Sequence, residues 1–157
     1  NVSSRLATVR LDPFQILAAE HAMLRRDFAS LVQGLEGPFG RSESVAALES
    51  LAHALAVHLR GEDEVVYPVC ERLFGGKAGA ASVLRQDHAS LRDRIDALMA
   101  ARSDSAPLSR ARLEMLRLEA SDHFGREERI LFPMTAALLS GTEADALARR
   151  LRTDSIR

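Results

Sequence analysis

Two stretches of this chain repeat one another, and the repeat limits the possible folds more than any other feature. Residues 58–68 read HLRGEDEVVYP, and residues 123–133 read HFGREERILFP. Each stretch begins with His, has Glu four residues later, and ends with an aromatic residue before Pro. Upstream, EHAMLR at residues 20–25 matches DHASLR at residues 87–92. An internal repeat of this kind predicts two copies of one structural unit.

Apolar residues at three- and four-residue steps predict that both units are helical. Ala, Leu, Arg and Glu are abundant and favour helix, and no alternating strand pattern is present. The predicted helices cover residues 13–33, 42–74, 80–101 and 108–139, a short fifth helix covers 142–152, and residues 1–11 form an N-terminal arm. Four long helices with short loops favour an all-α, up-down-up-down four-helix bundle in a single domain.

Two prolines interrupt the predicted helices. Pro68 and Pro133 lack a backbone donor and should bend the second and fourth long helices. The inward stripe of the fourth helix is predicted to include Ile130 and Met134. Thr142 is predicted to cap the short fifth helix.

Composition limits the possible partners. The net charge is −1 and no long basic run occurs, so binding to nucleic acid or to an anionic membrane is not expected. No apolar run is as long as a membrane span, and no secretory signal opens the chain, so we expect a cytoplasmic location. The single cysteine, Cys70, excludes an internal disulfide. Nothing in the sequence names a protein partner.

Six polar residues fall on the inward faces of the four long helices: His21, His58, Glu62, His88, His123 and Glu127. Residues four apart on a helix project the same way, so each His-x-x-x-Glu pair can address one site. An unpaired buried carboxylate costs on the order of several kcal/mol, so the two glutamates need cations or strong donors. Imidazole with carboxylate suits iron, manganese or zinc. Six groups are too many for one closed zinc site, whereas two metals bridged by both glutamates use them all. The alternative is a bundle that packs its histidines against carboxylates without metal.

Several neighbouring residues are predicted to lie outside this set. Asp63 and Glu128 follow the glutamates and are expected to face away from the core. Glu20 and Asp87 either orient neighbouring groups or lie on the surface. His53 is predicted to face solvent or to stand behind the ligands.

Three further residues have weaker assignments. Glu119 lies one helical turn before a predicted ligand and is a candidate proton carrier. Tyr67 aligns with Phe132 in the repeat, so its hydroxyl is not part of the repeated design. Cys70 is predicted to be a packed apolar residue.

The pattern resembles the hemerythrin-like (HHE cation-binding) family over about residues 13–139. That resemblance implies a four-helix bundle with two iron ions joined by an oxo or hydroxo group. It assigns one iron to His21 and His58, the other to His88 and His123, and the bridging role to Glu62 and Glu127.

The sequence departs from the oxygen-carrying hemerythrins in two places. Arg92 stands where they have a second histidine, and Glu127 lies four residues after the last His where they have Asp at five. The resulting four-His, two-Glu set is similar to the bacterial repair-of-iron-centres proteins and to the iron-sensing domain of an F-box protein.

The function predicted from these residues is binding of a non-haem di-iron pair that senses, scavenges or reduces O2, NO or peroxide. The alternative is iron storage, iron donation or iron sensing without turnover, and a third possibility is a structural bundle with a vestigial site. Manganese or zinc in place of iron stays open, and the sequence does not decide whether the protein is an enzyme.

Overall fold

The described part of the chain is helical throughout. The computed structural model describes residues 12–37, 39–76, 79–102 and 107–154, and no β-strand occurs within these ranges. The helices are α1 (Pro13–Glu36), α2 (Arg41–Gly61), α3 (Tyr67–Leu73), α4 (Ala80–Ala101), α5 (Arg110–Arg126), α6 (Phe132–Leu138) and α7 (Gly141–Asp154). The all-helical prediction is confirmed, whereas the predicted arm at residues 1–11 lies outside the described residues.

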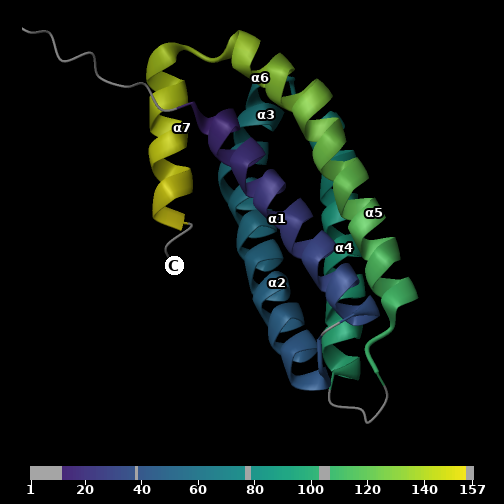
Figure 1. The fold of residues 1–157 in the computed structure, drawn as a ribbon. Coiled ribbons are helices and arrows are strands. Elements are labelled where there is room, and N and C mark those ends of the chain that lie inside the picture. The colour runs from purple at the N-terminus through teal and green to yellow at the C-terminus, as the bar shows by residue number, and fades with distance from the viewer. Residues whose placement is uncertain (1–11, 38, 77–78, 103–106, 155–157) are drawn as a thin grey trace, which may run out of the picture.

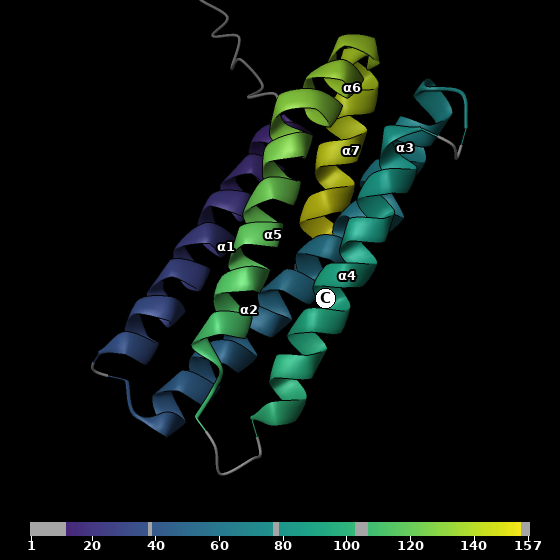
Figure 2. The same ribbon diagram turned by 90° about the vertical axis from the view of Figure 1, so that its right-hand side faces the viewer.

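Two π-helical turns make longer composite helices. The turn η1 (Glu62–Val66) joins α2 to α3, and η2 (Glu127–Leu131) joins α5 to α6. With α1 and α4, these composite helices pack side by side around a common core (Figures 1 and 2). α1 contacts α2 and α5, and α4 contacts the same two helices.

Local sequence signals set the helix boundaries. The Asp12 carboxylate accepts a hydrogen bond of 2.9 Å from the Phe14 N–H, as expected of an N-cap before Pro13. The α2–η1–α3 composite ends where Gly75 adopts a φ of 80°, a left-handed conformation that favours glycine.

The fifth helix is present but is capped by a different residue from the one predicted. Ser140 Oγ accepts from the Glu143 N–H at 3.3 Å, and the Glu143 carboxylate accepts from the Ser140 N–H at 3.0 Å. This reciprocal pair is a capping box, so the prediction of Thr142 as the cap was wrong. α7 packs against α1, α2 and η1, and its buried residues are Leu147, Ala148 and Leu151. None of the described helices has the length and apolarity needed to cross a lipid bilayer.

The π-turns lie one turn before the two prolines. In η1, the Tyr67 N–H bonds to the Glu62 carbonyl, five residues back, and η2 repeats this bond directly before Pro133. A proline ring crowds the carbonyl four residues earlier and offers no N–H. Widening the preceding turn relieves that crowding, which explains why the irregularity lies ahead of Pro68 rather than at it.

This widening changes which residues face the core. One extra residue in a turn rotates the following helix by about 100°. Ile130 and Met134, predicted to point inward, are therefore 51% and 49% exposed, whereas Leu131, Phe132 and Thr135 are buried. The predicted stripe was wrong beyond Glu127 because it assumed a constant helical period.

The core consists of two apolar clusters. One includes Leu24, Leu55, Leu91 and Leu116, and the other includes Leu17, Val65, Leu84 and Leu131. On each composite helix, and on α1 and α4, the residues between the two clusters are the predicted polar residues. The six polar side chains thus form a layer between two apolar regions.

Candidate metal centre

The structure brings all six predicted side chains into this polar layer. α1 and α4 contribute His21 and His88, α2 and α5 contribute His58 and His123 near their ends, and the glutamates open η1 and η2. His58 is 4% exposed, and the other five residues are fully buried.

Their potential ligand atoms form two groups of four that share both glutamates. The first cage consists of His21, His58, Glu62 and Glu127, and the second consists of His88, His123, Glu62 and Glu127. Within each cage, one nitrogen or oxygen from every residue lies within 4.8 Å of the other three. Ligand atoms bound about 2.0–2.2 Å from one metal ion lie at most about 4.4 Å apart. Cages of this size therefore need little rearrangement to hold transition-metal ions.

Several atoms that face the centre have no hydrogen-bond partner among the described residues. They are His21 Nε2, His58 Nε2, both carboxylate oxygens of Glu62 and one of Glu127. The nearest histidine nitrogens and glutamate oxygens are 3.3–3.4 Å apart. Charge-assisted hydrogen bonds are shorter, about 2.7–2.9 Å. Because buried carboxylates without partners are costly, these residues fit a pair of bound cations.

Without metal ions, the side chains of the centre differ widely in pKa. Burial and the charge of Glu62 raise the pKa of Glu127 to about 7. Burial alone would raise the pKa of Glu62, but the surrounding histidines hold it well below its ordinary value. Burial alone would also lower the pKa of His21 and of His88, yet the carboxylates around them raise both to about 9. Burial and the neighbouring His88 lower the pKa of His123 to about 4. Cations in the cages would compete with these protons.

Comparison with protein families agrees with this geometry. The sequence matches the family model of the hemerythrin HHE cation-binding domain over residues 12–135. This chain belongs to the hemerythrin HHE family. The resemblance found in the sequence is thereby confirmed, and the matched range contains all six centre residues. No curated protein gives a significant match.

Each histidine of this HHE domain is held from behind by a carboxylate. Nδ1 lies 2.9 Å from Glu128 in His21, 2.8 Å from Glu20 in His58, 3.0 Å from Asp63 in His88, and 3.4 Å from Asp87 in His123. An ionised carboxylate can only accept, so each Nδ1 carries the proton and Nε2 is left to face the cage. The imidazoles are therefore oriented for metal binding.

Two of these carboxylates contradict the prediction. Asp63 and Glu128 were expected to face away from the core, but both point into seams between neighbouring helices. A position one residue after an inward glutamate lies about 100° around the helix, which in this packing is the seam rather than solvent. Glu20 and Asp87, whose roles were left open, have the orienting role.

Arginines neutralise the outer carboxylates in both halves. Arg25 binds Glu128 at 2.8 Å, and its repeat counterpart Arg92 binds Asp63. These arginines end the repeated segments EHAMLR and DHASLR. The spacing from acid to His to Arg was thus a sequence signal for the outer ring.

Sequence reasoning missed the position of Tyr67 at the centre. Its hydroxyl donates to Glu127 Oε1 at 2.6 Å, and its oxygen lies 2.9 Å from His88 Nε2. Burial beside two carboxylates raises the pKa of Tyr67 far above its ordinary value, so the hydroxyl keeps its proton. Its repeat counterpart, Phe132, stacks near His21 and has no hydroxyl. The signal was visible in the repeat as a tyrosine replacing a phenylalanine.

The remaining candidates lie outside the cages. His53 is exposed, and Glu119 forms a 2.6 Å ion pair with Arg94, so neither contacts the centre. Cys70 is fully buried, and its sulfur lies 3.3 Å from the hydroxyl of its repeat counterpart, Thr135.

Proposed function

We propose that this protein binds two iron ions, one in each cage. His21 and His58 would hold the first ion, His88 and His123 the second, and Glu62 and Glu127 would bridge both. The observation that supports this proposal best is that both glutamates belong to both cages. Family membership favours a cation site, and the mixture of imidazole and carboxylate ligands suits iron, with manganese or zinc as the other metals of this class.

We further propose that the iron pair senses, scavenges or reduces a small ligand, namely O2, NO or peroxide. Four protein donors per cage leave room for another ligand on an ion that prefers six. A bound ferrous pair supplies one electron per ion, and the chain sets how a ligand reaches it. The apolar clusters above and below exclude water from the cages.

In this proposal Tyr67 holds a proton beside the centre. Its hydroxyl oxygen lies 2.9 Å from His88 in the second cage, and its donation to Glu127 fixes where that proton lies. The outer carboxylates fix the orientation of the histidines. The arginines balance the negative charge of these carboxylates.

Metal analysis and spectroscopy test the proposal. We expect about two iron atoms per chain, and stopped-flow mixing of the reduced protein with NO, O2 or H2O2 should change its visible absorption. One metal per chain would contradict the shared-glutamate arrangement. Two metals without any spectral change would contradict reactivity while leaving binding intact.

A second function, iron storage, donation or sensing without turnover, is favoured by the unpartnered carboxylate oxygens. Because they are buried without hydrogen bonds, metal binding should strongly stabilise the fold. Denaturation and limited proteolysis of metal-free and iron-loaded protein measure this coupling. Strong stabilisation without reaction with any of the three ligands would favour this second function.

The architecture that we propose for this centre is a single domain of up-down-up-down topology with an internal two-fold repeat. Consecutive long helices contact each other, and α1 also contacts α5, which closes the bundle. The repeat explains why each half contributes two histidines and one glutamate.

A further inference from the structure

Among the grooves outside the centre, two have linings that the repeat relates, one in each half. The first groove lies between α1 and α2 and reaches Glu20 and His58. The second lies between α4 and α5 and reaches Asp87, the carboxylate that holds His123. The grooves thus occupy matching positions behind the two cages.

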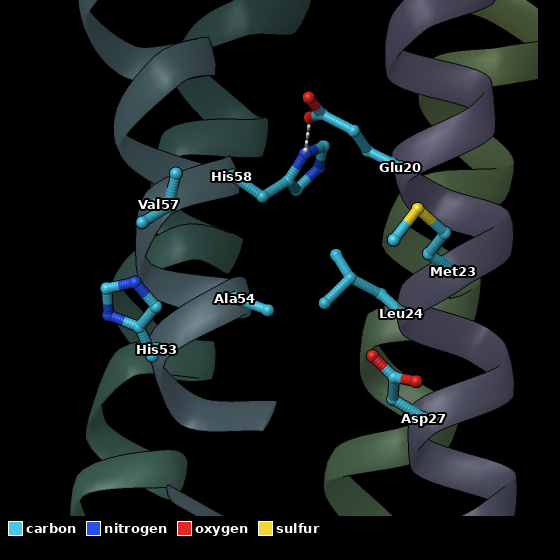
Figure 3. A pocket seen from close by; sticks show the side chains of 8 residues that line it. All are labelled: Glu20, Met23, Leu24, Asp27, His53, Ala54, Val57 and His58. Atoms are coloured by element: carbon cyan, nitrogen blue, oxygen red, sulfur yellow. Dashed lines mark hydrogen bonds and ion pairs between the residues drawn. The ribbon is translucent and has the colours of Figure 1, made fainter. Parts of the chain in front are cut away.

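The first groove has a mostly apolar surface and meets the centre at a polar pair, Glu20 and His58. Met23 and Leu24 from α1 point across the gap toward Ala54 from α2, with the His58–Glu20 hydrogen bond at one end (Figure 3). The groove holds about 220 Å³. A water molecule takes about 30 Å³ and drug-sized ligands need about 300–1,000 Å³, so the groove suits a few very small molecules.

The second groove is crossed by charged groups at the equivalent positions. Glu119 replaces Ala54 and forms an ion pair of 2.6 Å with Arg94. Arg126 replaces Gly61 and binds Asp87 at 3.0 Å.

The same arginine reaches one further carboxylate. Asp122, which replaces Val57, lies 3.4 Å from Arg126. A molecule of low polarity would have to separate these ion pairs to approach His123. The first groove has its own polar pair, Glu20 with His58 at 2.8 Å, but Ala54 and Val57 stand where the second groove has Glu119 and Asp122.

The centre is also least buried at the first groove. His58 is 4% exposed, and the other five residues of the centre are fully buried. We propose that the groove between α1 and α2 is the binding and access site for an uncharged diatomic gas, O2 or NO, on its way to the first cage. This inference rests on the proposed reactivity of the metal pair and narrows the ligand to small molecules of low polarity.

The carboxylates at the ends of the groove fit such a ligand better than an anion. Glu20 and Asp27 lie at opposite ends of the groove, and Glu20 is at the end that holds His58 (Figure 3). Their negative charges repel an approaching anion but have little effect on O2 or NO.

Xenon binding tests the groove without relying on reactivity. Xenon occupies apolar cavities in proteins, so crystals of the iron-loaded protein under xenon pressure should show xenon beside Ala54 and Met23. No xenon is expected beside Asp122 in the second groove. Xenon missing from the first groove, or equally present in both, would overturn the inference.

A matched pair of substitutions tests the route. Met23 and its repeat counterpart Ser90 are both exposed and line the two grooves, so tryptophan at either position should leave the fold intact. Met23→Trp should lower the association rate constants of NO and of O2 with the reduced protein about tenfold, whereas Ser90→Trp should change them less than about twofold. Iron content and the final spectrum should match the unsubstituted protein in both variants. Ala54→Phe, which fills the groove from the opposite wall, should slow association as Met23→Trp does.

The outcomes separate this inference from the proposed function. Equal association rates in Met23→Trp and Ser90→Trp would show that the gas does not use the first groove. If the unsubstituted reduced protein reacts with neither gas, the proposed reactivity toward O2 and NO fails, and the xenon positions still decide whether the groove binds apolar gas. Measuring NO and O2 separately shows which of the two the groove admits faster.

Discussion

The two halves of this molecule share one ligand arrangement but differ in the surroundings of their cages. Both halves supply two histidines, one glutamate and two outer carboxylates, and Arg25 and Arg92 bind equivalent carboxylates. The two halves are alike in the histidines and glutamates that line the cages and in the carboxylates that orient the histidines. A symmetric ligand set therefore does not make the two cages chemically equivalent.

The differences lie on opposite sides of the centre. Tyr67 places a hydroxyl at the second cage where Phe132 has only a ring at the first. The groove behind the first cage is mostly apolar, whereas ion pairs cross the groove behind the second. These differences underlie our proposals that a small ligand approaches the first cage and that Tyr67 holds a proton at the second.

The strongest test of the shared ligand set removes both glutamates. The double substitution Glu62→Ala and Glu127→Ala should abolish binding of both metals, because each carboxylate belongs to both cages. Either single substitution should weaken both cages together, and His21→Ala should affect mainly the first. Metal content per chain measures these effects, and two metals retained in the double variant would refute the bridging role.

Both halves should contribute to the pH dependence of the stability of the metal-free protein. His21 and His88 are repeat counterparts, and both have a pKa of about 9, raised from 6.5. A raised pKa stabilises the folded state below 6.5, and this contribution disappears as the pH rises through 9. The free energy of unfolding should therefore fall by about 1 kcal/mol or more between pH 7 and 9.

Urea denaturation of the metal-free protein at both pH values checks this expectation. The variant His88→Gln should lose about half of the pH dependence. If the unsubstituted protein is equally stable at pH 7 and pH 9, the raised pKa values are wrong.

Removing an outer carboxylate should lower metal affinity in both halves, but to different degrees. Asp63→Ala and Glu128→Ala each remove the group that orients one histidine, which typically lowers metal affinity about 10–100-fold. Asp63 also binds two arginines, Arg85 and Arg92, so its loss should be the more severe. Competition with a chelator measures the affinities. Glu64→Ala, at an exposed neighbouring position, is the control and should have no effect.

Replacing Tyr67 with phenylalanine, the residue at the equivalent position 132, should make the two halves more alike. Tyr67→Phe removes a hydrogen bond to a carboxylate and should destabilise the metal-free protein by about 1.5–3 kcal/mol. In the iron-loaded protein, Mössbauer spectra should show two distinguishable iron sites that become more similar in Tyr67→Phe. Unchanged spectra would mean that the hydroxyl does not distinguish the cages.

The smallest effect is expected at His53. Its repeat counterpart is Leu118, and it lies exposed outside both cages. His53→Ala should leave metal content unchanged and alter the free energy of unfolding by less than about 0.5 kcal/mol. Loss of metal in this variant would show that the centre extends beyond the six residues.

Helix positions and ligand candidates were predictable because they depend on local periodicity. The inward stripes of α1 and α4, such as Leu17, Leu24 and Leu91, are buried as predicted. Prediction failed beyond Glu127, where Ile130 and Met134 turn outward, because a π-turn shifts the phase of the helix. It failed also at Asp63, whose position in a seam depends on how a neighbouring helix is rotated.

The sequence by itself determined the helical fold, the duplication and the six polar residues, because these follow from spacing along one helix. Only the tertiary structure decided that each glutamate lies in both cages, that carboxylates from neighbouring helices hold the histidines, and that Tyr67 reaches Glu127. It also decided which groove is apolar. These features depend on the distance and rotation between helices, which no periodicity within one helix records.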